Sequence, residues 1–180
     1  MGRTEERLSS MTVSLHNFVD MYARALATAD HLLTKGVAHA VAAGGAEGDV
    51  LGWRLVDDMN PLSFQLEVVV NFSRNWIARA AGLPLPATIN GADLSVEQFH
   101  AEIASARSFL DGISAEHLAG RDEAAVTFKI GEIMEPTLPA AQWITGFATT
   151  NIMFHLSIAY AILRVQGVPL GKIDMFPTGL

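Results

Sequence analysis

The stretch TNIMFHLSIAYAILRVQG, residues 150–167, decides the fold class of this chain. It holds one formally charged residue, Arg164, and it ends at Gly167, a residue type that commonly terminates helices. Apolar residues lie on almost every side of a helix with this sequence, and such a helix is typically buried. The stretch therefore predicts a helix over about Thr150–Gln166 that is the central and most buried member of an all-α protein.

The same region raises the question of a membrane span, because no charged residue occurs between Glu135 and Arg164. A spanning helix needs about 20 predominantly apolar residues. Polar residues and a proline interrupt this region, among them Pro139, Gln142 and Asn151. The sequence therefore favours a core helix, with no membrane partner and a cytoplasmic location.

Three further helices are predicted from apolar residues that recur at three- and four-residue steps. Each has a start or stop signal: a glycine at the end, an Asn-Pro pair at the start, or a capping box of Ser and Gln. The expected helices run from about Thr12 to Lys35 with Gly36 as the stop, from Asn60-Pro61 to Gly82, and from Ser95 with Gln98 onward. A Pro-rich linker over residues 83–94 separates the last two.

A short extended or hairpin segment is expected before the last helix. Val126, Phe128 and Ile130 alternate there with polar residues, which is the pattern of a half-buried strand. In the C-terminal tail, Lys172 and Asp174 are expected at the surface. Helices joined by short connections form bundles, so the sequence predicts a four-helix bundle.

One domain over residues 12–180 is expected, after a disordered N-terminal tail over residues 1–11. Residues 1–10 are rich in charge, with no apolar run after them, so they do not form a secretory signal. Met11 is a second candidate for the natural start. At 180 residues the chain is long enough to bury its own core.

The composition limits the classes of partner. Half of the residues are hydrophobic and 17% are charged, below the roughly 25% of typical globular proteins. Such an apolar excess favours a homodimer and a pocket for a small apolar metabolite. The net charge of −7 and the 12 Lys and Arg residues argue against nucleic acid, whose phosphates need clustered basic residues. The absence of cysteine excludes disulfides and thiolate chemistry.

His155 is the most informative single residue, because it lies in the middle of an apolar helix between Phe154 and Leu156. Two interpretations are open: a core histidine satisfied by a hydrogen bond, or an acid/base group or ligand that lines a pocket. Asn151, four residues earlier, and Ile162, seven residues later, fall on the same stripe of the helix. Tyr160 falls on a neighbouring face.

Three polar positions around the second helix complete the candidate site. Asp58, next to Asp57, precedes the helix, where the helix dipole favours a carboxylate and where a general base is conceivable. Gln65 and Asn71 lie on different faces of an otherwise apolar helix, so at most one of them is expected to face a pocket. The candidate catalytic residues are His155, Asn151 and Asp58, and the candidate substrate-binding residues are Gln65, Asn71, Tyr160 and Ile162.

Two segments resemble a known family. NIMFHLSIAYAILRVQGVPLGKIDMF (151–176) and LVDDMNPLSFQ (55–65) are similar to an uncharacterised domain-of-unknown-function family within the DinB/YfiT-like superfamily. The resemblance covers nearly the whole chain from Met11. It implies a DinB-like up-down four-helix bundle.

The resemblance also implies a metal site in related enzymes, with which the residues of this chain can be compared. Enzymes of the DinB type resemble metal-dependent thiol transferases and isomerases with three histidine ligands, two of them in an HxxxH pair on the last helix. His155 matches the second histidine of that pair, but Asn151 stands in place of the first. Gln65 or Asn71 stands where the third ligand is expected. One imidazole and two carboxamides match zinc or nickel poorly, so we expect no metal and no cofactor.

The sequence leaves several functions open. The first is a metal-free small-molecule enzyme of isomerase or lyase type with an apolar pocket around His155. The alternatives are a non-catalytic binding protein for an apolar metabolite, a structural dimer, and a metal-dependent protein similar to the thiol transferases. A cavity of about 300 Å³ or more beside His155 would favour an enzyme or a binding protein.

Overall fold

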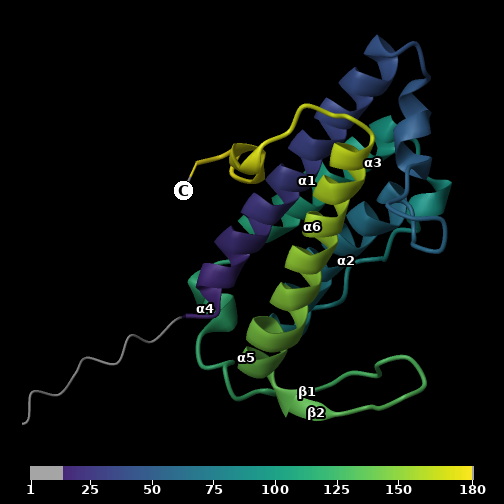
Figure 1. Ribbon diagram of the computed structural model, residues 1–180. Helices are drawn as coiled ribbons and strands as arrows, with labels where there is room; N and C mark the ends of the chain where they lie inside the picture. The colour runs from purple at the N-terminus through teal and green to yellow at the C-terminus, as the bar shows by residue number, and fades with distance from the viewer. Residues whose placement is uncertain (1–13, 180) are drawn as a thin grey trace, which may run out of the picture.

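Four long helices form a bundle in the computed structural model, which describes residues 14–179 (Figure 1). They are α1 (His16–Ala42), α2 (Leu62–Ala81), α3 (Val96–Asp111) and α6 (Thr149–Val165). The expected all-α bundle is therefore confirmed. The tail expected over residues 1–11 and the second possible start lie outside the described residues.

Shorter elements connect the long helices. They are η1 (Glu47–Gly52), η2 (Gly91–Asp93), α4 (Ala115–Leu118), β1 (Ala125–Thr127), β2 (Thr137–Pro139), α5 (Ala140–Gln142), η3 (Trp143–Ala148) and η4 (Lys172–Met175). Strand β1 pairs antiparallel with β2, with Val126 opposite Leu138. This hairpin projects from the end of the bundle just before the last helical run, as the alternation of residues predicted (Figure 1).

The four helices do not simply alternate in direction. Gly91, just before α3, donates its N–H to Glu67 near the start of α2, so α2 and α3 begin at the same end of the bundle. The order along the chain is therefore up, down, down, up (Figure 1). A helix of 20 residues is about 30 Å long, a length that roughly ten residues of extended chain can retrace. The linker with Pro84 and Pro86 provides that length.

Side chains of α2 hold this linker along the helix. Asn71 donates from Nδ2 to the Ile89 carbonyl at 3.0 Å and accepts the Ile89 N–H at its Oδ1, also at 3.0 Å. The buried Arg74 donates to the Ala87 carbonyl and to a carboxylate oxygen of Glu102 on α3. Both side chains thus use their polar groups to set the path from α2 to α3.

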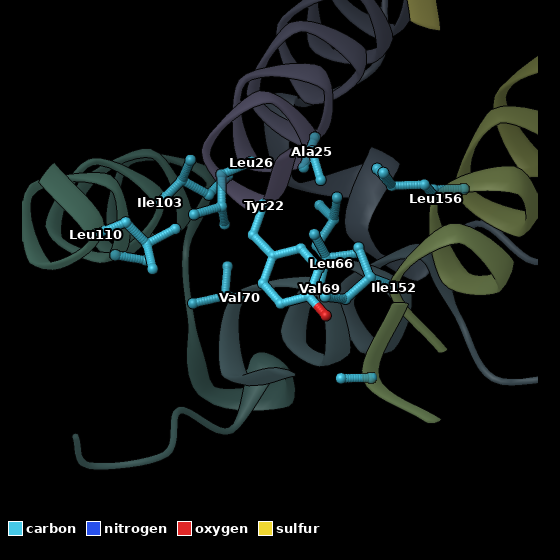
Figure 2. Close-up of a cluster of buried hydrophobic side chains, with 14 of the residues drawn as sticks. Tyr22, Ala25, Leu26, Leu66, Val69, Val70, Ile103, Leu110, Ile152 and Leu156 are labelled. Atoms are coloured by element: carbon cyan, nitrogen blue, oxygen red, sulfur yellow. The ribbon is translucent and has the colours of Figure 1, made fainter. Parts of the chain in front are cut away.

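The hydrophobic core lies where all four helices meet (Figure 2). Tyr22 of α1, Leu66 of α2, Ile103 of α3 and Ile152 of α6 contribute to it, and each is at most 1% exposed. Helix α2 is buried along its whole length because it packs against the other three long helices.

The expectation that the last helix is the most buried is therefore wrong. Helix α6 packs against α1 and α2 on one side only, and Phe154 and Val165 on its other side are 55% and 63% exposed. The apolar sequence of α6 thus reflects an uncovered apolar face as well as a buried one.

Gly36 does not stop the first helix, which continues to Ala42. A Cβ at this position would lie 2.7 Å from Leu163 Cδ2 and 2.8 Å from Val50 Cγ2, and both of those residues are fully buried. The glycine is therefore a point of close approach between α1, α6 and η1. Its role as a helix stop was an incorrect interpretation.

The last helical run begins earlier than Thr150. It starts at Ala140 after Pro139, passes through the π-helical stretch η3 and continues as α6 to Val165. By length and composition alone the run Ala140–Val165 is long and apolar enough to cross a membrane. On one side this run packs against α1 and α2.

The C-terminal tail is fastened to α1, contrary to the expectation that Asp174 lies at the surface. Its carboxylate accepts hydrogen bonds from His31 Nε2 at 2.8 Å, from Lys35 Nζ at 3.0 Å and from the Gly171 N–H at 2.7 Å. These bonds hold the pKa of Asp174 well below its usual range. Lys172 is exposed, as expected.

Candidate functional site

His155 lies on α6 opposite α2, with aromatic rings on two sides. The Phe64 ring is 5.8 Å from the imidazole and the Phe154 ring 5.2 Å, both in edge-to-face geometry. Burial lowers the pKa of His155 below the usual value for histidine, because an apolar environment disfavours the charged form. The imidazole is therefore neutral at pH 7.

A chain of hydrogen bonds fixes which imidazole nitrogen carries the proton. Gln65 donates from Nε2 to the Asn60 carbonyl at 3.0 Å, and a carbonyl only accepts. The other amide atom, Oε1, therefore faces His155 Nδ1 at 2.7 Å and can only accept a hydrogen bond from it. Neutral His155 is consequently protonated at Nδ1, which leaves the lone pair of Nε2 available as a base or ligand.

Local sequence explains why Gln65 is held so firmly. Pro61 precedes the first residue of α2 and Asn60 precedes Pro61, so the Asn60 carbonyl lies beside the first turn of the helix. Gln65 follows one turn later on the face that packs against α6, and it is only 3% exposed. The start of α2 thus orients the glutamine that orients the histidine.

The other two candidate catalytic residues do not join this chain. Asn151 lies one turn before His155 on α6, and its Nδ2 donates to the Phe147 carbonyl at 2.8 Å. Asp58 is exposed in the turn before α2 and makes no hydrogen bond or ion pair among the described residues. Among the candidate catalytic residues, only His155 forms a hydrogen bond with a candidate substrate-binding residue, and that residue is Gln65.

The remaining candidates lie in different surroundings. Asn71 uses both amide atoms on the linker backbone, on another face of α2 than Gln65. Ile162 is fully buried in the core, and Tyr160 is half-buried against it. Gln65 faces His155 and Asn71 lines a separate hollow of about 200 Å³, in line with their expected placement on different faces.

Several hollows occur at a distance from His155. One of about 380 Å³ is lined by residues of the tail, among them Ile173 and Phe176, and one of about 240 Å³ by residues that include His39 and Trp53. His155 lines neither of them, so neither is the cavity beside His155 that would favour an enzyme or a binding protein. The imidazole is half-buried and lies next to the exposed Phe154, near the surface of the bundle.

The structural roles of two polar residues, Tyr22 and Asp174, were not predicted from the sequence. The Tyr22 hydroxyl donates to the Ile144 carbonyl at 3.1 Å and lies 2.9 Å from Thr149 Oγ1, deep in the core (Figure 2). Burial raises the pKa of Tyr22 far above its usual value. Asp174 is the second, and no local signal marks either, because their partners are far away in sequence.

The fold defined by these elements is that of the DinB class of helical bundles. A solved structure of a DinB family member protein from Shewanella denitrificans superposes with a TM-score of 0.81. It is 23% identical, and the match covers 91% of this chain and 92% of that one.

The chain belongs to the family described as "Domain of unknown function (DUF1993)", which matches residues 15–176. A comparison with curated proteins gave no match. The resemblance noted in the sequence is therefore confirmed.

The donor atoms around His155 do not fit the three-histidine metal site implied for the DinB class. Among residues 14–179 no three His, Cys, Asp or Glu side chains are grouped so that they could hold a metal ion. The Gln65 oxygen, the atom through which a carboxamide binds a metal, is committed to the imidazole. Carboxamides are also weak partners for zinc and nickel.

Proposed function

We propose that this protein is a small-molecule enzyme of isomerase or lyase type that uses His155 as a metal-free general base. The observation that carries the proposal is the chain from His155 Nδ1 through Gln65 to the Asn60 carbonyl. It leaves Nε2 as a free base, and the lowered pKa of His155 keeps that base unprotonated at pH 7.

The proposed proton transfer requires no other reactive group of the protein. Nε2 takes a proton from a carbon or oxygen of the substrate, and the resulting imidazolium keeps its Nδ1–H bond to Gln65 Oε1. In an isomerisation the proton returns to a neighbouring atom of the substrate. In an elimination the electron pair of the broken bond expels a leaving group, and the proton passes to solvent.

The apolar surroundings of His155 support a substrate of apolar character. Phe64 and Phe154 flank the imidazole, and Phe154 is exposed enough to contact a bound molecule. We further propose a homodimer that covers this face of α6 and thereby closes the site, and a cytoplasmic location. The uncovered apolar face of α6 supports the dimer.

A base-sensitive probe tests the proposal without knowledge of the natural substrate. With 5-nitrobenzisoxazole, a base removes the proton at C3 while the N–O bond breaks, which releases a coloured cyanophenolate. We expect turnover above the buffer rate, with a loss of roughly 100-fold in His155→Gln, within the range typical of general-base catalysis. His117→Gln is the matched control, because His117 is exposed and bonds only within its own short helix.

The outcomes separate the alternatives. Turnover that is equal in the wild type and His155→Gln would overturn the proposal. Binding of the probe without turnover would favour a non-catalytic binding protein for an apolar metabolite. Turnover abolished by a chelator and restored by zinc or nickel would instead favour a metal-dependent protein similar to the thiol transferases.

A further inference from the structure

The last helical run contacts α2 at two places, one at the start of the π-helical stretch η3 and one beyond it. At the start of η3, Trp143 is 2% exposed and stacks on Trp76 with ring centroids 5.0 Å apart. About three turns further on, His155 Nδ1 lies 2.7 Å from Gln65 Oε1. Trp76 and Gln65 both belong to α2, so the run is held against the same helix at both places.

The spacing of these two contacts does not suit a regular α-helix. Twelve residues separate Trp143 from His155. At about 100° per residue, an unbroken α-helix would point the two side chains about 120° apart. A π turn takes up one residue more than an α turn, which reduces the difference to about 20°. The π turn thus lets Trp143 and His155 face α2 together.

The carbonyl of Ile144 is the acceptor around which the π turn forms. It accepts the backbone N–H of Thr149, five residues later, which is the bond that distinguishes a π turn from an α turn. It also accepts a hydrogen bond from Thr149 Oγ1 at 2.8 Å and one from the Tyr22 hydroxyl at 3.1 Å. In an unbroken α-helix this carbonyl would instead bond the N–H of residue 148.

The support of this turn is tertiary as well as local. Tyr22 lies on α1, is fully buried in the core, and its hydroxyl also lies 2.9 Å from Thr149 Oγ1 (Figure 2). π-Helical turns are rare in proteins, so one that persists needs contacts that favour it over the α-helical path. The hydroxyls of Tyr22 and Thr149 supply such contacts, because both bond the carbonyl that the π turn uses.

We propose that Tyr22 and Thr149 are positioning residues for His155. Together they hold the π turn at Ile144, and the π turn keeps α6 in the rotation at which the imidazole Nδ1 meets Gln65 and Nε2 is left free. Neither residue contacts the substrate. The consequence for catalysis rests on the proposed function of His155, whereas the rotation of α6 does not.

Two ring N–H groups report this rotation without any substrate: Nδ1–H of His155, bonded to Gln65, and Nε1–H of Trp143, which donates to the Val126 carbonyl at 2.8 Å. NMR on the full chain with isotope-labelled histidine and tryptophan measures how fast each exchanges with solvent. In the double variant Tyr22→Phe/Thr149→Val we expect at least one of them to exchange roughly tenfold faster, the scale on which one or two hydrogen bonds shift an opening equilibrium.

Thr145→Val is the matched control for the loss of a threonine hydroxyl in the same run. Thr145 Oγ1 donates to the Ala141 carbonyl at 2.7 Å, one turn earlier at the exposed surface, and does not contact Ile144 or Tyr22. Both ring N–H groups are expected to exchange in this variant as they do in the wild type. Equal exchange in the double variant, in Thr145→Val and in the wild type would overturn the proposal.

Deletion of Gly146 tests the geometry itself. This exposed glycine lies inside η3, and a Cβ there meets nothing within 4 Å, so no side-chain contact depends on it. Without the extra residue the run can form an unbroken α-helix in which Trp143 and His155 still face α2 to within about 20°. We expect both ring N–H groups to exchange as slowly as in the wild type, and the changes at Tyr22 and Thr149 to have no further effect in this background.

Loss of either slowly exchanging N–H on deletion of Gly146 would contradict the role of the π turn, even where the double variant does not fold. Turnover of 5-nitrobenzisoxazole gives a separate readout. The double variant is expected to show a several-fold lower kcat with an unchanged KM at a temperature at which it is folded, and deletion of Gly146 is expected to restore kcat. A wild-type kcat together with faster N–H exchange would show that the two residues do not position the base. No turnover in the wild type would contradict the proposed function, and the exchange rates would still test the rotation of α6.

Discussion

Two titratable side chains, His155 and Asp174, have pKa values below their usual ones for opposite reasons. Burial beside Phe64 and Phe154 disfavours the charged form of His155, which is thereby kept neutral. Hydrogen bonds from Gly171, His31 and Lys35 favour the charged form of Asp174. The first arrangement suits a base, and the second suits a permanent anchor for the tail.

Asp174→Asn is predicted to loosen the tail and to lower the free energy of unfolding at pH 7 by about 1.5–3 kcal/mol, the usual contribution of hydrogen bonds to a charged group. A carboxylate with a depressed pKa in the folded state stabilises fully above its unfolded pKa, near 4, and loses this contribution as the pH falls further. Urea unfolding at pH 7 and at pH 3 measures both effects. A difference between wild type and variant that is as large at pH 3 as at pH 7 would contradict the anchor.

The sequence predicted which single residues were candidates for the site, but it did not predict their hydrogen-bond partners. His155 and Gln65 were both candidates, yet their bond joins positions 90 residues apart, which no local pattern reveals. Asp174 was expected at the surface because His31 lies 143 residues before it. A single sequence carries no record of such distant contacts.

Helices and their ends were more predictable, because caps are local. The capping box of Ser95 and Gln98 and the left-handed Gly82 at the end of α2 both occur where the sequence placed them. The shared direction of α2 and α3 was not predictable. It depends on the path of the linker, which Asn71 and Arg74 fix through the fold.

Gly36→Ala is predicted to destabilise the protein, although alanine is the better helix former by about 1 kcal/mol. The new methyl group would crowd the fully buried Leu163 and Val50, and overpacking of this kind costs about 1–3 kcal/mol. Less the gain of about 1 kcal/mol in helix propensity, the net loss is up to about 2 kcal/mol, so we expect the melting temperature to fall by up to about 8 °C, given about 2–4 °C per kcal/mol for a chain of this size.

Gly146→Ala is the control for the same chemical change. A Cβ at Gly146 meets nothing within 4 Å, so this variant is expected to melt at or slightly above the wild-type temperature. Thermal unfolding followed by circular dichroism compares the two. Equal melting temperatures for both variants would show that α1 and α6 do not approach as closely at Gly36 as described here.

Part of the apolar excess of the molecule lies on one side of α6, and other exposed apolar side chains lie on the hairpin loop (Ile133) and in the tail (Ile173). Phe154, Ile158 and Val165 follow one another at helical spacing along that side, and the first and last are exposed. The high apolar content of the sequence indicated that some apolar surface would lie outside the core. It gave no indication of which helix would carry that surface.

A homodimer through this face of α6 is predicted, with about 800 Å² buried on each protomer as in stable interfaces of standard size. Light scattering at micromolar concentration is expected to give twice the chain mass of 19.3 kDa. Phe154→Glu should return the protein to the single-chain mass without unfolding it. Ile133→Glu, at an 82% exposed position of the hairpin loop, is the control and should remain dimeric.

The π-helical stretch η3 has a consequence for how chains of this family are compared. A π-helical turn is the structural form of a one-residue insertion into an α-helix. Each residue advances an α-helix by about 100°. An alignment without a gap across residues 143–148 would therefore pair each residue before the stretch with a residue on a neighbouring helix face of the relative. A relative without the insertion therefore needs a one-residue gap there before its counterpart of Trp143 can be named.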